Sequence, residues 1–438
     1  MKAKLYDLMN WAEIEGVVYS EEDRPGTILG TKTVGTSTLY QTFYPGAKKI
    51  TLILEDKGKR VSMDMADEEG FFAATAAGKK VGAYSYEIVT KAGEKIIRKD
   101  PYAFEVSVEQ EELNRFYEGT NYGVYKVFGS HEVEINNTKG VQFTIWAPRA
   151  MRLSVIGDFN DWDTTACPMK RLDNGVFEVK LKGAKALLPG QKVQAIVIHN
   201  GQQLRRIPTY ATRVVQDPVT YMWCAEIEDK MKKFAWTDEE FRTPDTPFIY
   251  ECHIGMAQEK YDVGTYQEFT ELTLPRIKEL GYNTIQIMAI MEHPYYGSFG
   301  YQVSNFFAAA SRYGHSEDLK KLINTAHEMG IAVLLDVVHS HAVKNTNEGL
   351  NQFDGTEYQF FHSGEKGEHS AWGTKLFNYG KNEVLHFLLS NLKYWMEVFH
   401  FDGFRFDGVT SMLYLDHGLG SAFSDYSMYF SMNTDVEA

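Results

Sequence analysis

Residues 331–338, IAVLLDVV, are almost entirely apolar, and this run constrains the fold more than any other stretch of the chain. A strand that is apolar on both faces belongs in a sheet covered on both sides, which is typical of parallel sheets. The surrounding sequence alternates between strand and helix patterns, with strands expected at 248–253, 283–290, 331–338 and 403–407. Such alternation predicts a parallel sheet or a (β/α)8 barrel.

The expected barrel region, residues 240–438, is too short for a complete barrel. An eight-fold barrel typically takes about 250 residues, and one long segment here, Ala342–Lys381, carries little regular pattern. Long irregular segments inside compact domains are usually functional. We therefore expect the chain to hold the first half of a (β/α)8 TIM-type barrel and to stop before the rest.

The sequence before residue 240 has the pattern of antiparallel sheets. Short β-branched and aromatic segments are separated by glycine-containing turns, which is typical of β-sandwiches. We predict an N-terminal β-rich module at 1–107, a linker or helix at 108–124 and a second β-sandwich at 125–232. The expected fold class is multidomain, with two N-terminal β-sandwich modules followed by the incomplete barrel.

Composition narrows the partners and the compartment. The net charge of −14 leaves no basic surface for nucleic acid or an anionic membrane, and it suits a neutral substrate. No run approaches the ~18 uncharged apolar residues of a membrane span, and the first residues lack the apolar region of a signal peptide. Three widely spaced cysteines form no disulfide framework. We expect a cytoplasmic protein, and the oligomeric state stays open.

Chemically active side chains gather where the expected strands end. They are His293, Tyr301 and Gln302 after the second strand, Asp336 and His341 at the third, and Arg405 and Asp407 at the fourth. In a barrel, the carboxyl ends of the strands face the active site. A single Asp at a strand end also forms turns, and Arg-x-Asp is also a common local ion pair. The joint occurrence of these groups at successive strand ends favours an active site.

Arg405 and Asp407 are two residues apart in an expected strand, so their side chains point to the same face of the sheet. An arginine beside a carboxylate favours the ionised form of that carboxylate. A nucleophilic carboxylate has to be ionised to attack. The pair therefore predicts a nucleophile, Asp407, with Arg405 as its partner.

These motifs resemble those of a known family. DVVHSH (Asp336–His341) and GFRFDGVTSMLY (Gly403–Tyr414) resemble the first two catalytic-barrel signatures of the α-amylase superfamily, glycoside hydrolase family 13. Longer segments are similar to the 1,4-α-glucan (glycogen) branching enzymes of that superfamily, and the resemblance covers the chain from about residue 110 onward. These segments are MAIMEHPYYGSFGYQVSNFFA (Met288–Ala308), SRYGHSEDLKKLI (Ser311–Ile323), FDGTEYQFFHSG (Phe353–Gly364), IPTYATRVVQDP (Ile207–Pro218) and LPRIKELGYN (Leu274–Asn283).

The resemblance implies a double displacement on α-1,4-glucan that retains configuration and transfers a glucan segment to a sugar 6-hydroxyl. The catalytic groups that it implies are Asp407 as nucleophile, Arg405 as its orienting partner, and Asp336 and His341 as groups that hold the sugar. The substrate-binding groups are Tyr301, a platform for the reacting sugar, Gln302 beside it, and His293. For His293 a purely structural role in its loop is the alternative.

The chain also departs from the family pattern. The family's acid/base glutamate follows its fifth strand, and a His-Asp pair comes later still; neither is found in this sequence. The acids after Asp407 are Asp416, Asp425, Asp435 and Glu437, none of which ends an apolar strand. We therefore expect an enzyme that is truncated before its acid/base and is inactive alone.

Two smaller departures concern metal and acceptor. Ser340 stands where many amylases carry a calcium-binding asparagine, so we predict no calcium, no other metal and no cofactor. The segment 415–418 reads LDHG, where relatives often have several histidines. The contacts to the acceptor sugar therefore stay open.

The second β module has a signature of its own. WAPRAMRLSVIGDFNDWD (Trp146–Asp163) resembles the glycogen-binding sandwich found ahead of such barrels. Trp162 would then stack on a sugar and Lys192 would bond its hydroxyls. The alternative is that Trp162 packs within the sandwich and Lys192 is merely solvated.

Three functions remain open from the sequence. The first is transfer of an α-1,4-glucan segment in glycogen synthesis. The second is hydrolysis of α-glucan by an amylase-type or debranching-type enzyme, which shares the nucleophile but uses water. The third is a non-catalytic glucan-binding protein, which the missing glutamate permits.

Overall fold

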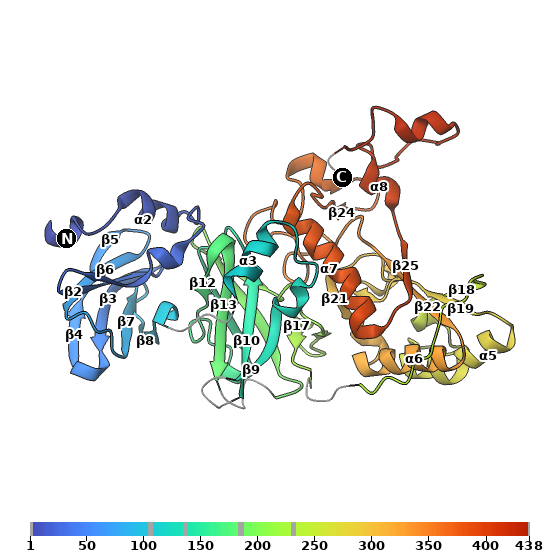
Figure 1. Ribbon diagram of the computed structural model, residues 1–438, viewed down its shortest axis with the longest axis horizontal. Coiled ribbons are helices and arrows are strands. Elements are labelled where there is room, and N and C mark those ends of the chain that lie inside the picture. Colours follow the sequence, from blue (N-terminus) through green and yellow to red (C-terminus); the bar gives the residue numbers. More distant parts are fainter. Residues whose placement is uncertain (1–2, 104–107, 135–138, 183–187, 229–233, 437–438) are drawn as a thin grey trace.

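The computed structural model describes residues 3–103, 108–134, 139–182, 188–228 and 234–436 (Figure 1). Three parts follow one another along the long axis of the molecule in sequence order (Figure 1). They are an N-terminal β module in blue, a second β module in cyan and green, and an α/β part in yellow to red. Among the described residues, no helix has the length and apolar character needed to cross a membrane.

The N-terminal module contains two four-stranded antiparallel sheets, β1-β2-β6-β5 and β4-β3-β7-β8. Leu52, Phe72 and Tyr86 belong to the core between them. The elements are α1 (Ala3–Tyr6), α2 (Trp11–Val18), β1 (Gly30–Val34), β2 (Ser37–Phe43), β3 (Ala47–Leu54), β4 (Lys59–Ser62), β5 (Asp64–Asp67), β6 (Phe71–Ala77), β7 (Tyr84–Thr90) and β8 (Lys95–Lys99).

The second module follows a short helix, α3 (Gln110–Tyr117), and again pairs two antiparallel sheets. Their orders are β12-β13-β10-β9 and β11-β14-β17-β16, with β15 paired to β14. The strands are β9 (Gly129–Glu134), β10 (Lys139–Trp146), β11 (Arg152–Gly157), β12 (Lys170–Arg171), β13 (Val176–Lys182), β14 (Lys192–His199), β15 (Gln202–Arg206), β16 (Val214–Gln216) and β17 (Trp223–Glu226). The prediction of two antiparallel β modules is therefore confirmed.

The α/β part is built on the sheet β18-β19-β22-β25, in which every pairing is parallel. Its four strands fall within the four runs that the sequence pattern predicts. The elements are β18 (Ile249–Cys252), α4 (Tyr266–Glu268), α5 (Leu274–Glu279), β19 (Thr284–Ile287), β20 (Met291–Glu292), β21 (Asn305–Ala309), α6 (Ser316–Glu328), β22 (Ala332–Val337), β23 (Glu368–His369), β24 (Thr374–Lys375), α7 (Asn382–Phe399), β25 (Gly403–Phe406) and α8 (Val409–Leu413).

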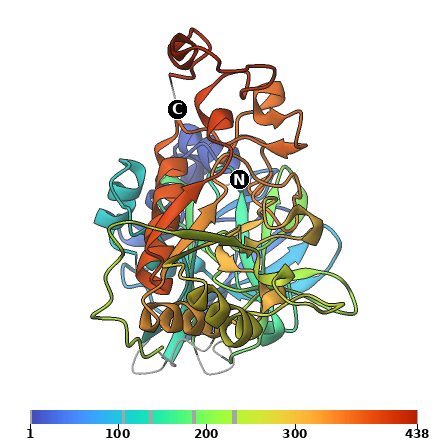
Figure 2. The ribbon, with the colours of Figure 1, turned by 90° about the vertical axis from the view of Figure 1, so that its right-hand side faces the viewer.

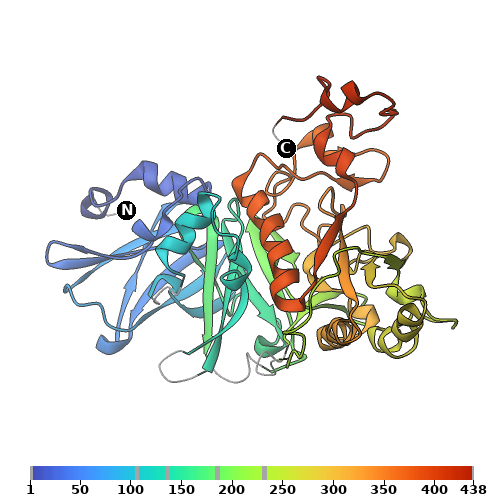
Figure 3. The same cartoon turned by 45° about the vertical axis from the view of Figure 1, so that its right-hand side comes forward.

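Burial explains the order of these elements. Five of the six β22 residues are buried, as expected for a strand covered on both faces. Helix α6 buries one apolar stripe, with Leu319, Leu322 and Ile323 fully covered. Figure 2 looks onto this part and shows the α5 and α6 helices gathered at one end, with the C-terminal residues at the opposite end. Helix α7 lies between the second module and the sheet (Figure 3).

The sequence pattern predicts one strand that is too long and misses a pair of short strands elsewhere. The strand expected at 283–290 ends at Ile287, and the chain leaves the sheet to form the antiparallel pair β20–β21. Segment 342–381 is not structureless, because it contains the pair β23–β24. Its buried phenylalanines, such as Phe353 and Phe361, pack without a fixed period, so no pattern reveals them.

The modules are joined in two different ways. One continuous apolar core runs through the second module and the α/β part, whereas the cores of the N-terminal module are separate from it. Polar contacts join the first two modules, including Arg98 Nε to Thr165 O at 2.6 Å and Arg171 Nη2 to Ser20 O at 3.1 Å. The second module and the α/β part therefore share one packed interior.

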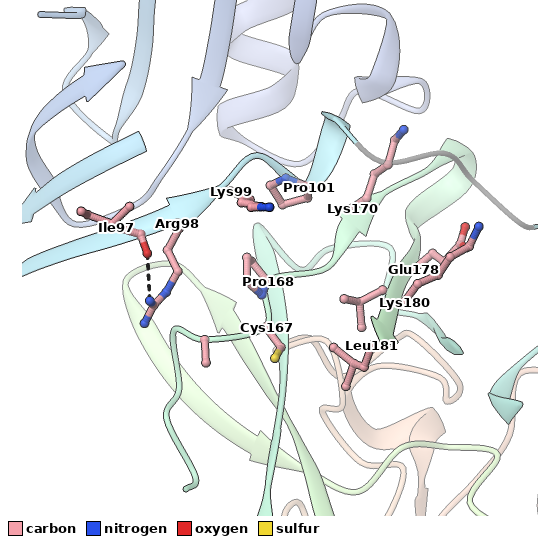
Figure 4. Close-up of a pocket in the computed structure, with 12 residues that line it drawn as sticks. Ile97, Arg98, Lys99, Pro101, Cys167, Pro168, Lys170, Glu178, Lys180 and Leu181 are labelled. Carbon is pink, nitrogen blue, oxygen red and sulfur yellow. Dashed lines mark hydrogen bonds between the residues drawn. The ribbon is translucent and has the colours of Figure 1, made fainter. Parts of the chain in front are cut away.

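A pocket of about 300 Å³ lies between β8 of the N-terminal module and β12 and β13 of the second (Figure 4). Pro101, Pro168 and Leu181 give it an apolar lining, and Arg98 turns back to donate Nη1–H to Ile97 O at 3.0 Å. None of its lining residues belongs to the α/β part. This pocket is therefore separate from the ends of the parallel strands.

A buried histidine ties the segment before β18 to the α/β part. His327, in the last turn of α6, has Nδ1 at 2.8 Å from Asp238 Oδ2 and Nε2 at 3.0 Å from Asp402 Oδ2. Asp402 also accepts the backbone N–H of Val333, and Asp238 also contacts His400 Nδ1 at 2.8 Å. Only the imidazolium form of His327 donates to both carboxylates, because a neutral ring carries a single N–H.

The charge of His327 follows from its surroundings. Burial lowers its pKa, but the hydrogen bonds and charges of Asp402 and Asp238 outweigh burial, so that the pKa is raised. A raised pKa means that the folded state holds the proton more tightly than the unfolded state, where the pKa is about 6.5. The stabilisation is complete below that pH and is lost as the pH rises through the raised pKa.

We predict that His327→Gln lowers the free energy of unfolding by about 3 kcal/mol at pH 6, because it leaves two buried carboxylates without their cation. The difference from the wild type should shrink by pH 9, where the wild-type ring has also lost its proton. Urea unfolding at both pH values measures this. His400→Gln is the matched control with one aspartate contact, and it should lose less. An equal loss for His327→Gln at both pH values would contradict the ionic role.

Candidate active site

Adjacent parallel strands bring three of the predicted side chains together. Asp336 in β22 is the register partner of Arg405 in β25. Arg405 Nη1 donates to both Asp336 oxygens at 3.0 Å and to Asp407 Oδ1 at 2.7 Å. Arg405 and Asp407 therefore lie on the same face, as their spacing predicts. One guanidinium nitrogen bridges two carboxylates at neighbouring strand ends.

The two carboxylates differ in exposure. The Asp336 side chain is fully buried, whereas that of Asp407 is 22% exposed. Burial raises the pKa of Asp336, and hydrogen bonds from Tyr301 and Arg405 oppose that rise. Burial would lower the pKa of Arg405, but the two aspartates outweigh it and raise the pKa. Arg405 thus stays charged and fixes the accessible carboxylate beside a buried one.

Tyr301 joins this cluster from the segment between β19 and β22. Its hydroxyl donates to Asp336 Oδ2 at 2.7 Å. Burial and the neighbouring Asp336 raise the pKa of Tyr301, so the phenol remains a donor. Asp336 therefore orients both Tyr301 and Arg405, and the four side chains Tyr301, Asp336, Arg405 and Asp407 form one hydrogen-bonded group.

The two predicted histidines are buried and uncharged near neutral pH. Burial, aided by the charge of His369, lowers the pKa of His341 to about 4. Burial likewise lowers the pKa of His293 to about 4. The His341 Nδ1 and His293 Nε2 atoms are buried and have no hydrogen-bond partner within the described residues. Both of these nitrogens are therefore closed off from solvent.

His293 and Gln302 are less closely tied to the cluster. His293 Nδ1 contacts Met291 O at 2.9 Å, and its carbonyl accepts Arg312 Nη2 at 2.7 Å. Its ring lies near that of Tyr313 rather than near Arg405. Gln302 is half-buried. The structure brings neither residue into the hydrogen-bonded group around Asp336.

Sequence reasoning missed an exposed tryptophan beside the cluster. Trp372, in segment 342–381, stacks on His369 with ring centroids 3.9 Å apart and an interplanar angle of 2°. Its ring also lies 4.8 Å from that of His341. A Cβ added to Gly408, the residue after Asp407, would lie 3.2 Å from Trp372 Cη2. The only signal for this residue was the length of its irregular segment.

The candidate sugar residues of the second module form a separate small cluster. Trp162 is half-buried, and its Nε1–H donates to Asp158 Oδ1 at 3.0 Å. The backbone N–H of Lys192 donates to Asp158 Oδ2, and its Nζ lies 2.6 Å from Asp217 Oδ2. The hydrogen bond that Lys192 donates to Asp217 raises the pKa of Lys192. Lys192 is therefore paired rather than merely solvated.

The part of the chain that the structure describes contains no group of three or more His, Cys, Asp or Glu side chains arranged to hold a metal. Ser340 Oγ is buried and has no partner there. It would lie 2.5 Å from a Cβ on Gly408. Gly408 adopts a φ of 64°, and this close approach explains why a glycine follows Asp407.

Two of the acids after Asp407, Asp416 and Asp425, accept hydrogen bonds within local turns. Asp416 accepts the Gly418 N–H and the Ser421 hydroxyl, each at 2.9 Å. Asp425 accepts the Ser427 hydroxyl at 2.6 Å and the Ser427 N–H at 2.8 Å. These hydrogen bonds lower the pKa of both carboxyls. Asp435 interacts with other residues, and Glu437 lies outside the described residues.

Three family descriptions match successive parts of the chain. Residues 10–102 match "alpha-1,4-glucan branching enzyme GlgB, N-terminal domain". Residues 127–218 match "Carbohydrate-binding module 48 (Isoamylase N-terminal domain)". Residues 256–375 match "Alpha amylase, catalytic domain", a stretch that includes Tyr301 and Asp336.

Curated relatives share long stretches of sequence with the chain. The 1,4-alpha-glucan-branching enzyme of Emericella nidulans is 49% identical over 334 residues, which are 74% of this chain and 47% of the relative. That of Aspergillus oryzae is 51% identical over 72% of this chain and 46% of the relative. That of Equus caballus is 45% identical over 78% and 52%. The chain spans about half the length of the curated relatives it matches.

Solved structures agree in fold. Type I pullulanase from Bacillus subtilis, complexed with maltose, superimposes with a TM-score of 0.55 at 19% identity, over 89% of this chain and 57% of that one. A putative alpha amylase from Salmonella typhimurium gives a TM-score of 0.52 at 22% identity, over 65% of this chain and 44% of that one. Over the residues that match, the chain therefore belongs to the α-amylase superfamily and is a homologue of its 1,4-α-glucan-branching enzymes.

Proposed function

We propose that this chain supplies the nucleophile side of a retaining 1,4-α-glucan-branching site. The observation that carries the proposal is the Arg405 bridge, because it holds an accessible carboxylate, Asp407, beside a fully buried one, Asp336. The branching-enzyme relatives support α-1,4-glucan as donor and a sugar 6-hydroxyl as acceptor. Hydrolysis by the same nucleophile is the alternative, with water in place of the acceptor.

The proposed first step is attack of Asp407 on the anomeric carbon of the donor sugar. A bond from C1 to the carboxylate oxygen forms while the bond from C1 to the glycosidic oxygen breaks. Arg405 orients the attacking carboxylate. Tyr301 offers an aromatic face to the reacting sugar. The ring of His341 is neutral near pH 7, because burial lowers its pKa to about 4, so it can serve either as a hydrogen-bond donor or as an acceptor.

The glycosidic oxygen needs a proton as it leaves, and a general acid supplies it when its pKa is raised towards neutrality. Asp416 and Asp425 are poor candidates, because their pKa values are lowered by the turns they stabilise. We propose that these 438 residues alone do not cleave or branch natural glucan. A donor whose leaving group needs no proton removes this requirement.

The test uses 5-fluoro-α-D-glucopyranosyl fluoride, because fluoride leaves without acid assistance and the ring fluorine slows release of the glucosyl group. C1–F breaks, a C1–O bond to Asp407 forms, and fluoride is released. We expect mass spectrometry of the digested protein to locate one 5-fluoroglucosyl group on Asp407.

Two variants sharpen the labelling experiment. Asp407→Asn should take no label, because the amide is not a nucleophile. Arg405→Gln should label at least tenfold more slowly, because the carboxylate loses its orienting partner. Asp416→Asn is the control and should label like the wild type. A label on another residue, or none on the folded wild type, would exclude Asp407 as the nucleophile.

We also propose that the second module binds α-glucan through Trp162. Its Nε1–H is anchored to Asp158, which leaves the indole fixed and partly exposed for stacking on a sugar ring. Lys192 contributes less to glucan binding, because its ammonium group is already paired with the Asp217 carboxylate. The match to a carbohydrate-binding module supports this assignment.

For this module we predict at least tenfold weaker binding of β-cyclodextrin to Trp162→Ala than to the wild type, measured by isothermal titration calorimetry. Lys192→Met should change the dissociation constant less than threefold. Unchanged affinity in Trp162→Ala would instead indicate that the indole only packs its turn.

A further inference from the structure

Trp372 combines exposure with a rigid position. Its side chain is among the exposed large apolar groups at 41%, whereas His369, on which it stacks, is fully buried. His369 Nε2 lies 3.0 Å from Ser411 Oγ in α8, and its Nδ1 accepts the Trp372 backbone N–H at 3.3 Å. The buried imidazole thus backs an indole that remains open to solvent. Fixed, exposed indoles are suited to stacking on flat apolar faces such as those of sugar rings.

This indole lies next to the proposed nucleophile. Gly408 follows Asp407 directly, and the space where its Cβ would be is bordered by Ser340 Oγ and Trp372 Cη2. The turn after the nucleophile therefore packs against the edge of the indole. Tyr301 and Asp336 lie on the β22 side of Asp407. Trp372 packs against Gly408, the residue that follows Asp407, and so offers a second aromatic surface next to the same carboxylate.

A row of rings continues from Trp372 towards an open groove. The ring of His417 lies 5.5 Å from that of His369. His417 also lines a groove of about 670 Å³, together with Ser370, Glu365 and Asp416. Hydroxyl, carboxylate and imidazole groups are the hydrogen-bonding partners that sugar hydroxyls require. The His417 Nδ1 atom is buried and has no partner among the described residues.

We propose that Trp372 is the stacking platform for the acceptor sugar, the unit that lies next to the reacting sugar and continues into the groove at Ser370 and His417. The inference rests on the proposed function and extends it, because it assigns an acceptor-side residue to a site described so far only on its donor side. Tyr301 faces the reacting sugar, and Trp372 faces its neighbour. The acceptor is an α-glucan chain, which presents repeated sugar faces for stacking.

The experiment distinguishes binding at the acceptor position from binding at the donor position, because the donor position is filled first. The full chain is labelled with 5-fluoro-α-D-glucopyranosyl fluoride, so that a covalent glucosyl group occupies the donor position. Maltotriose is then titrated by isothermal titration calorimetry into the labelled protein, with every protein also carrying Trp162→Ala so that the proposed site of the second module does not contribute. We expect Trp372→Ala to bind maltotriose at least tenfold more weakly than the wild type and to accept the label at an unchanged rate. Trp372→Phe, which keeps an aromatic face, should stay within threefold of the wild type.

Trp236→Ala is the matched control. Trp236 also stacks on a histidine, His400, with centroids 3.7 Å apart, but it precedes β18 and lies in the cluster of Asp238 and His327. It should leave maltotriose binding unchanged. Normal labelling with unchanged maltotriose affinity in Trp372→Ala overturns this inference alone, and so does slower labelling with unchanged affinity. Failure of the wild type to take any label overturns the proposed nucleophile and this inference with it.

Discussion

The fully buried carboxylate of Asp336 is the constraint on which the site depends. A buried charge is tolerated only when it is paired and hydrogen-bonded, and here Arg405 and Tyr301 meet that requirement. The same Arg405 nitrogen also donates to Asp407. The arginine that compensates the buried charge of Asp336 therefore also positions the accessible carboxylate. This arrangement needs β22 and β25 to be neighbours in parallel register. That in turn needs the apolar strand and the helices that cover it.

Much of this arrangement could be predicted from the sequence, for identifiable physical reasons. Side chains alternate along a strand, so Arg405 and Asp407 had to share a face, and parallel strands end at one edge, so Asp336 had to lie near them. Nothing comparable reveals Trp372, because its segment follows no period and its neighbour His369 is recognisable only in space. The Asp217 partner of Lys192 and the burial of His293 likewise depend on contacts between distant residues. The path of the chain after Ile287 depends on the pairing of β20 with β21. The alternation of apolar and polar residues in the sequence does not predict that pairing.

The way the parts are joined has a consequence for glucan handling. The second module shares its core with the α/β part, so the module that carries Trp162 packs directly against the part that carries Asp407. The N-terminal module is attached by polar contacts such as that of Arg98 with Thr165. The hydrogen bonds of His327 to Asp238 and Asp402 hold Asp238, which precedes β18, against α6 and the start of β25. The second module and the α/β part, which share one core, therefore carry the proposed sugar-binding surfaces between them.

We propose that Asp407, with Arg405, Asp336 and Tyr301 around it, already forms a working nucleophile. This proposal is tested most directly by incubating the chain with α-D-glucopyranosyl fluoride and sodium azide, since neither fluoride departure nor azide attack requires an acid or a base from the protein. The product is then examined by proton NMR for the configuration of its anomeric carbon. Two successive displacements through Asp407 predict α-glucosyl azide. β-Glucosyl azide would mean direct attack by azide without a covalent intermediate, and consumption no faster than in buffer would mean that Asp407 is not a working nucleophile; either result would contradict the account.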